Sequence, residues 1–138
     1  MAPPPPPTST DPKTPSFLGG APSATHLVVL VHGLWGSAVH MHSIASSLRA
    51  RYPPEDVFLL CAQSIGGIRT YDGVEHLGER VCADVEAAMA RQRAQRDGDG
   101  GFTKISFIGY SMGGLVSRYV VGLLEAKGVL EGIECMVS

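Results

Sequence analysis

The sequence predicts an α/β fold in which three mainly parallel strands are joined by crossover helices. Short apolar runs alternate with longer segments whose apolar residues repeat at helical spacing, in the order β-α-β-α-β-α. The runs are too hydrophobic to leave one face in water, so helices must cover both faces of the sheet, as is typical of parallel sheets. In such a sheet, ligands bind beyond the carboxyl ends of the strands.

The three predicted strands are continuous apolar runs rich in β-branched residues. They comprise Leu27 to Val31, Val57 to Cys61 and Ile105 to Ile108. A glycine-containing turn follows the first run and another follows the third. Because the carboxyl ends of parallel strands share one edge of the sheet, we expect these two turns to meet there.

Two of the three predicted helices are bounded by proline or glycine. The first, "HSIASSLRAR", places Ile44 and Leu48 four residues apart and ends before Pro53-Pro54. The last, "MGGLVSRYVVGLLEAK", carries apolar residues around most of its circumference. Gly128 follows directly and is expected to end it.

The middle helix is predicted from a long apolar stripe. Its start is marked by Asp72 as N-cap, with Glu75 three residues later completing a capping box, and "DGDGG" ends it. Capping accounts for Asp72 without any catalytic role. The stripe has helical spacing and consists of Val74, Leu77, Val81, Val85 and Met89.

The length of 138 residues predicts one domain preceded by a tail. Eight of the ten prolines fall within the first 22 residues, where no long apolar run or secretory signal occurs. We therefore expect a disordered Pro-rich tail over 1–24 and the folded domain over 25–138. A polyproline ligand for SH3, WW or profilin domains is an alternative role for residues 3–7, but a solvated tail is favoured.

Composition excludes several classes of function. A net charge of −2 offers no basic surface for nucleic acid, and no run approaches the roughly 18 apolar residues needed to cross a bilayer. Three widely spaced cysteines without zinc spacing are typical of a reduced, cytoplasmic protein. His40 and His42 stand two apart and cannot share a helical face, while Met41 between them is expected in the core. We expect no metal and no cofactor.

The most informative motif is Gly109-Tyr110-Ser111-Met112-Gly113, which joins a predicted strand to a predicted helix. G-x-S-x-G is weak as a string, but this context requires a sharp turn that strains Ser111 and exposes its hydroxyl. Glycines two residues before and after the serine avoid collisions where strand and helix converge. The alternative interpretation is a glycine-rich turn with an incidental serine. The context favours Ser111 as a nucleophile.

A second turn, "HGLWG" from His32 to Gly36, supplies what such a serine needs. A tetrahedral acyl intermediate requires two N–H donors. His32 and Gly33 would let the backbone turn so that the Leu34 N–H faces the Ser111 hydroxyl, and the Met112 N–H would be the second donor. Leu34 and Trp35 either contact an acyl chain or pack locally. Nucleotide binding is excluded because no phosphate-binding glycine motif occurs in the sequence.

Three stretches together, "HLVVLVHGLWG", "TYDGVEHLGERV" and "ISFIGYSMGGLVSRYVVGLL", resemble the eukaryotic serine esterases of the lipase type, within the α/β-hydrolase superfamily. The resemblance runs from Leu27 to about Leu130 and covers the N-terminal part of that fold. It implies a hydrolase of lipid or carboxylic esters with Ser111 as nucleophile and Leu34 and Met112 in the oxyanion hole. It is compatible with peripheral contact at membrane or lipid-droplet surfaces. Lysophospholipases, thioesterases and glycolipid-anchor deacylases are more distantly similar, so the substrate stays open.

The catalytic partners of the serine are missing from the motif pattern. In α/β-hydrolases an acid and then a histidine follow the serine, whereas all five histidines here precede Ser111. We therefore expect a truncated esterase domain with little or no turnover by these residues alone. The alternative is a non-catalytic fragment or interaction module that uses the Pro-rich tail or an exposed sheet edge.

Overall fold

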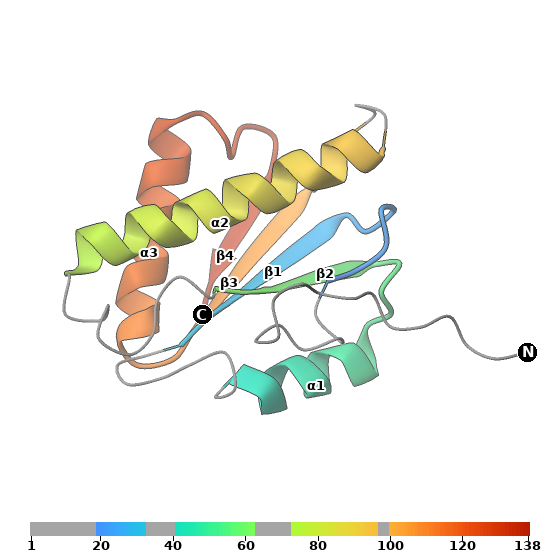
Figure 1. Ribbon diagram of the computed structural model, residues 1–138, viewed down its shortest axis with the longest axis horizontal. Helices are drawn as coiled ribbons and strands as arrows, with labels where there is room; N and C mark the ends of the chain where they lie inside the picture. Colours follow the sequence, from blue (N-terminus) through green and yellow to red (C-terminus); the bar gives the residue numbers. More distant parts are fainter. Residues whose placement is uncertain (1–18, 33–40, 63–72, 97–99) are drawn as a thin grey trace, which may run out of the picture.

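The computed structural model describes residues 19–32, 41–62, 73–96 and 100–138, and these form one sheet with helices on both faces (Figure 1). The helix α2 lies above the sheet in this view and α1 lies below it. The elements in chain order are β1 (His26–Val31), α1 (His42–Arg51), β2 (Val57–Cys61), α2 (Val74–Gln95), β3 (Lys104–Gly109), α3 (Met112–Ala126) and β4 (Glu134–Val137).

The sheet has the strand order β2-β1-β3-β4, and every neighbouring pair is parallel. This confirms the predicted α/β class with a parallel sheet. Val31 at the end of β1 is in register with Gly109 at the end of β3. The two glycine-containing turns therefore leave neighbouring strands at the same edge, as predicted.

The sheet contains a fourth strand where three were predicted. β4 runs from Glu134 to Val137, and its side chains alternate between exposed and half-buried. A strand covered on one face only does not need a continuous apolar run, so "ECMV" lacks the signal by which the other strands were found. It extends the parallel sheet beside β3.

Alternate side chains of β1 enter two separate cores, which explains its continuous apolar run. Leu27, Val29 and Val31 pack beneath α2 and α3. Val28 and Leu30 point to the other face and pack with the α1 side, where Met41 is buried as predicted. Phe107 of β3 is fully buried in the first core. The sheet is thereby held rigidly beneath the turns at its carboxyl edge.

A glycine lies at the start of α2 and another lies just after the end of α3. The predicted stripe of α2 is confirmed, but its N-cap is Gly73 (φ 96°) and not Asp72, because the Gly73 carbonyl accepts the first helical bond from Leu77 at 3.0 Å. Asp72 itself lies outside the described residues. Gly128 ends α3 as predicted: it has a positive φ of 73°, and its N–H donates to the Glu125 carbonyl at 3.0 Å.

The described chain begins six residues before the predicted domain boundary at Thr25. Gly19 forms an antiparallel bridge with Leu59 of β2, and Ala24 is fully buried. The Arg49 guanidinium of α1 donates to the Gly19 carbonyl and, at 3.1 Å, to the Val57 carbonyl. Residues 19–24 are thus tied to the edge of β2. Within the described ranges, none of the helices has the length and apolar character required to cross a bilayer.

Candidate active site

The turn from β3 into α3 is bonded directly to the end of β1. The Tyr110 N–H donates to the Val31 carbonyl at 3.0 Å, and the Gly113 N–H donates back to the Tyr110 carbonyl at 2.9 Å. Between them, Ser111 takes φ 57° and ψ −125° and is the one non-glycine residue with positive φ in the described chain. Such a conformation is costly and requires the surrounding structure to enforce it.

Ser111 is the N-cap residue of α3, yet its hydroxyl makes no capping hydrogen bond. Serine is a favoured N-cap because its oxygen usually accepts a hydrogen bond from the first helical turn. Here Ser111 is exposed, and its strained backbone is not accompanied by such a hydrogen bond. A capping role therefore does not account for this serine.

The two flanking glycines stand where no side chain fits. A Cβ atom on Gly109 would lie 2.5 Å from the Cα atom of Gly114 in the first turn of α3. A Cβ atom on Gly113 would lie 2.8 Å from the carbonyl oxygen of His32 and closer still to that of Val31. The collisions expected from the motif are thus present on both sides of Ser111. They show that α3 packs its first turn against both β3 and the end of β1.

The first residue of α3 offers a backbone donor beside the serine. Met112 is the first helical residue, a position whose N–H has no acceptor within its own helix. One turn further on, the buried Ser117 hydroxyl donates to the Gly113 carbonyl at 2.7 Å and strengthens this turn. The positive end of the helix dipole also lies at this end of α3, where a developing oxyanion would be stabilised.

Only the first residue of the second predicted turn, His32, lies within the described residues. His32 directly follows β1 and is buried with 2% exposure. Its carbonyl oxygen faces Gly113, so the chain leaves β1 beside the turn from β3 into α3. The predicted oxyanion donor Leu34 and the supporting Gly33 and Gly36 lie outside the described residues, as do Trp35 and His40.

Two other histidines of the described fold are already engaged away from the serine. His26 Nε2 on β1 lies 2.8 Å from the Ser106 hydroxyl, and His76 Nε2 on α2 lies 3.2 Å from Arg80 Nε. Burial, with a smaller contribution from Lys104, lowers the pKa of His26. Neither contact includes Ser111. Within the described residues no cluster of three or more histidine, cysteine or acidic side chains is placed to hold a metal ion.

The thiols offer no competing nucleophile. Burial raises the pKa of Cys61 to about 11. Burial also raises the pKa of Cys82, with a contribution from Glu86, and that of Cys135, with a contribution from Glu125. Because the thiolate is the reactive form, a raised pKa makes each of these thiols less reactive than an ordinary cysteine near neutral pH.

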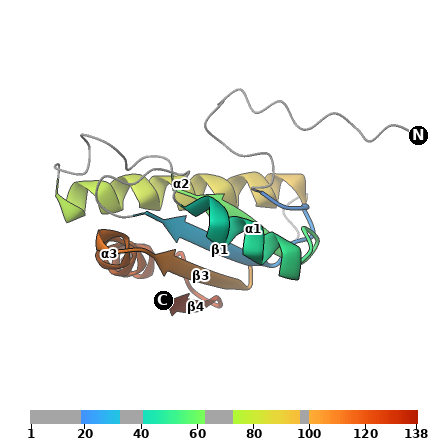
Figure 2. The same ribbon diagram turned by 90° about the horizontal axis from the view of Figure 1, so that it is seen from below.

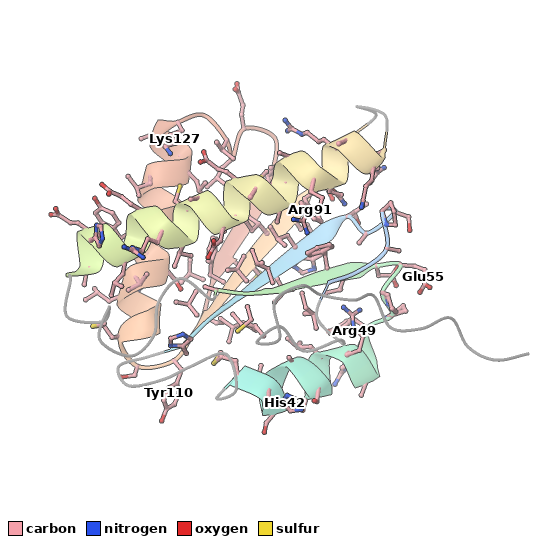
Figure 3. All side chains as sticks on the ribbon, viewed as in Figure 1. His42, Arg49, Glu55, Arg91, Tyr110 and Lys127 are labelled. Carbon is pink, nitrogen blue, oxygen red and sulfur yellow. The ribbon has the colours of Figure 1, made fainter. Side chains whose placement is uncertain are left out.

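A small hollow lies beside the turn from β3 into α3, next to the end of β4. It has a volume of about 280 Å³ and is lined by Gly109, Gly114, Leu115, Arg118, Val137 and Ser138. Leu115 and Arg118 follow Ser111 by four and seven residues, so they share its face of the helix. This spacing from Ser111 is the signal in the sequence that indicates them. Figure 3 shows Tyr110, which is 66% exposed, pointing outward from the turn.

Solved structures with similar folds are thioesterases of the α/β-hydrolase type. The RedJ thioesterase from the prodiginine pathway of Streptomyces coelicolor superposes with a TM-score of 0.55 at 22% identity, covering 86% of this chain and 41% of that one. The type II thioesterase BorB from the borrelidin cluster gives a TM-score of 0.58 at 19% identity, covering 88% and 44%. At these identities the likeness shows the fold alone.

Sequence relatives are lipases. Triacylglycerol lipases of Pseudarthrobacter phenanthrenivorans and Burkholderia plantarii are each 31% identical in an alignment of 102 positions, and each alignment covers 70% of this chain. The chain spans 28% and 25% of these two lipases. The sequence pattern of the family described as "Putative serine esterase (DUF676)" matches residues 21–137. Since that match covers well over half of the chain, the protein belongs to this family, DUF676.

Proposed function

We propose that the protein is a serine hydrolase of the lipase or esterase type that acts on lipid or carboxylic esters through an acyl-enzyme on Ser111. Membership of a serine esterase family and the likeness to two triacylglycerol lipases support this class of reaction. The observation that carries the assignment to Ser111 is its strained backbone (φ 57°), combined with a hydroxyl that caps no helix.

The proposed reaction follows from the geometry of the turn. The Ser111 oxygen attacks the ester carbonyl carbon while its proton passes to a base, and the carbonyl oxygen becomes an oxyanion. The N–H groups of Met112 and Leu34 stabilise that charge. Collapse expels the alcohol, which takes up the proton, and leaves an acyl-serine. Water then attacks the acyl-serine, releasing the carboxylic acid and restoring the hydroxyl.

The proposal assigns no residue of this chain as the base that accepts the proton of Ser111. A serine hydroxyl is a poor nucleophile until a histidine accepts its proton. All five histidines of the sequence precede Ser111, whereas the hydrolase order places the catalytic histidine after it. We therefore propose that these 138 residues by themselves turn over esters weakly. We also propose that the protein is cytoplasmic and contacts lipid surfaces, in keeping with the proposed substrate class.

Rescue by an external base tests the proposal. Imidazole added in solution replaces a missing catalytic histidine, so hydrolysis of p-nitrophenyl butyrate by the 138-residue chain should rise with imidazole concentration. The Ser111→Ala variant provides the matched control, because it reports hydrolysis by imidazole alone. A Ser111-dependent component that increases with imidazole supports the nucleophile. Identical rates for the two proteins, both folded, would favour the alternative of a non-catalytic interaction module.

A further inference from the structure

A thiol and an amine meet between α2 and α3. Lys127 is the C-cap residue of α3, and its Nζ atom lies 3.8 Å from the Sγ atom of Cys82 on α2. The same Nζ atom lies 3.4 Å from a carboxylate oxygen of Glu86, which follows Cys82 by one helical turn. Two side chains of α2 thus hold the amine of Lys127, although this residue lies 45 positions after Cys82 in the sequence.

Close packing of the two helices holds this pair in place. Figure 2 shows α2 and α3 as neighbours when the molecule is seen from below, and both bury residues in the same core. One turn before Cys82, a Cβ atom on Gly78 would lie 3.0 Å from the Cε1 atom of Tyr119 and closer still to its Cδ1 atom, so this ring rests on the α2 backbone. The backbone of Lys127 is fixed as well, because its N–H donates to the Leu123 carbonyl at 3.0 Å. The fold therefore sets the separation of sulfur and amine.

The sulfur is covered, whereas the amine beside it is open to solvent. Cys82 is 1% exposed, but the side chain of Lys127 is 51% exposed. A groove of about 520 Å³ also reaches this point, with Glu86, Lys127 and Gly128 among the residues that line it. A small oxidant such as hydrogen peroxide can reach the sulfur when the lysine head group moves aside, whereas a bulky thiol is kept away from it.

We propose that Cys82 and Lys127 form an oxidative cross-linking site, at which hydrogen peroxide joins α2 to α3 through a sulfenamide (S–N) bond. In the first step the Cys82 thiolate attacks one peroxide oxygen. The S–O bond forms, the O–O bond breaks, and the departing hydroxide takes up the thiol proton and leaves as water. The sulfur is thereby oxidised by two electrons to a sulfenic acid, and the peroxide is reduced.

The second step is a condensation that needs no further oxidant. The Lys127 ammonium releases one proton to solvent, and its nitrogen attacks the sulfur of the sulfenic acid. The S–N bond forms, the S–O bond breaks, and the oxygen leaves as water with a second proton from the nitrogen. Because the amine touches the sulfur while other thiols are kept away, its effective concentration far exceeds that of a competitor in solution. The sulfenic acid is therefore trapped as the cross-link, and neither step involves Ser111.

The surroundings of Cys82 favour trapping of the oxidised sulfur over rapid oxidation. Burial, with a contribution from Glu86, raises the pKa of this thiol, while Lys127 acts in the opposite direction. The first step is accordingly slower than for an ordinary cysteine, and we expect the link to form under sustained peroxide. At Cys135 the charged group that shifts the pKa is the carboxylate of Glu125, which cannot condense as an amine does. Of these two thiols, Cys82 is the one placed to form a sulfenamide.

Peptide mapping tests the cross-link. The folded 138-residue chain is treated with millimolar hydrogen peroxide and digested with trypsin without a reducing agent. Residues 81–91 should then appear joined to residues 119–138, at about 2 Da less than the summed masses of the two peptides. Cleavage after Lys127 should be absent because trypsin requires the free amine, whereas a disulfide to Cys135 would leave this cleavage intact and contradict the assignment. Dithiothreitol should release the two peptides.

Lys127→Arg is the matched control, because it keeps the positive charge and offers no amine that can condense. In this variant the linked peptide should be lost, and Cys82 should carry added oxygen instead, as a sulfenic or sulfinic acid located by fragmentation. Dithiothreitol should lower the urea midpoint of the oxidised unaltered chain, since it removes the link, but not that of oxidised Lys127→Arg. An oxygen-bearing Cys82 without the linked peptide in both proteins, or a Cys82 that stays a free thiol in the oxidised unaltered chain, would overturn the proposal. Circular dichroism establishes that the variant is folded.

Discussion

A Cβ atom on Gly113 would lie 2.8 Å from the carbonyl oxygen of His32, so the first turn of α3 is pressed against the end of β1. This contact couples the helix that carries Ser111 to the strand that leads into the second turn. It also means that the conformation of Ser111 depends on a glycine two residues away.

Replacing Gly113 should therefore damage the fold more than replacing its neighbour. Gly113→Ala forces a side chain against backbone atoms, which cannot move cheaply, and should cost about 1–3 kcal/mol or more. Gly114→Ala is the matched control: a Cβ there meets nothing within 4 Å, and alanine stabilises a helix by about 0.5–1 kcal/mol relative to glycine. Urea denaturation of both variants measures the difference. Equal stabilities would contradict the close approach.

His26 should make stability depend on pH in the acid range. Burial lowers its pKa in the folded state below the ordinary 6.5, so the unfolded chain binds a proton more readily. The contribution of His26 is fully present above pH 6.5, and it is lost as the pH falls through the lowered pKa. The free energy of unfolding, measured by urea denaturation from pH 7.5 to 5, should decline. His26→Gln should flatten this decline, and an unchanged slope would argue against the assignment.

Cys61 should resist alkylation while the chain is folded. Its pKa of about 11, against 9.0 for the ordinary thiol, makes its thiolate about a hundredfold scarcer at pH 8, and the side chain is buried. Iodoacetamide labelling followed by peptide mapping should modify the half-buried Cys135 before Cys61. In denaturant the two should react at similar rates. Rapid labelling of Cys61 in native buffer would show that this strand is not buried as described.

The sequence patterns that predicted correctly are those with a local physical cause. The stripe from Leu77 to Met89 repeats at helical spacing and is buried along its length. Gly128 was recognisable because a helix that ends with a left-handed residue favours glycine there. The strain at Ser111 was predictable because the flanking glycines have no other evident use in a strand-to-helix turn.

The features that escaped prediction depend on contacts between distant segments. β4 is covered on one face only, so its residues lack the continuous apolar run of the other strands. Gly19 pairs with Leu59 across forty positions of sequence, and no local pattern signals that bridge. The N-cap of α2 is Gly73 and not the predicted Asp72. The positive φ of Gly73 turns the chain into the helix, and the capping-box pattern does not reveal this conformation. In the site, the hollow formed by Leu115 and Arg118 appears only once β4 is in place.

The most direct test of the central claim is covalent labelling of Ser111. A fluorophosphonate phosphonylates activated serine hydroxyls, so the folded 138-residue chain, supplied with imidazole as the external base, should acquire one adduct, mapped to Ser111 by mass spectrometry and lost in Ser111→Ala. Ser117→Ala, which removes a buried hydroxyl one turn further along α3, should still be labelled. Equal labelling of the unaltered chain and Ser111→Ala, or an adduct at another serine, would contradict the assignment of Ser111 as the nucleophile.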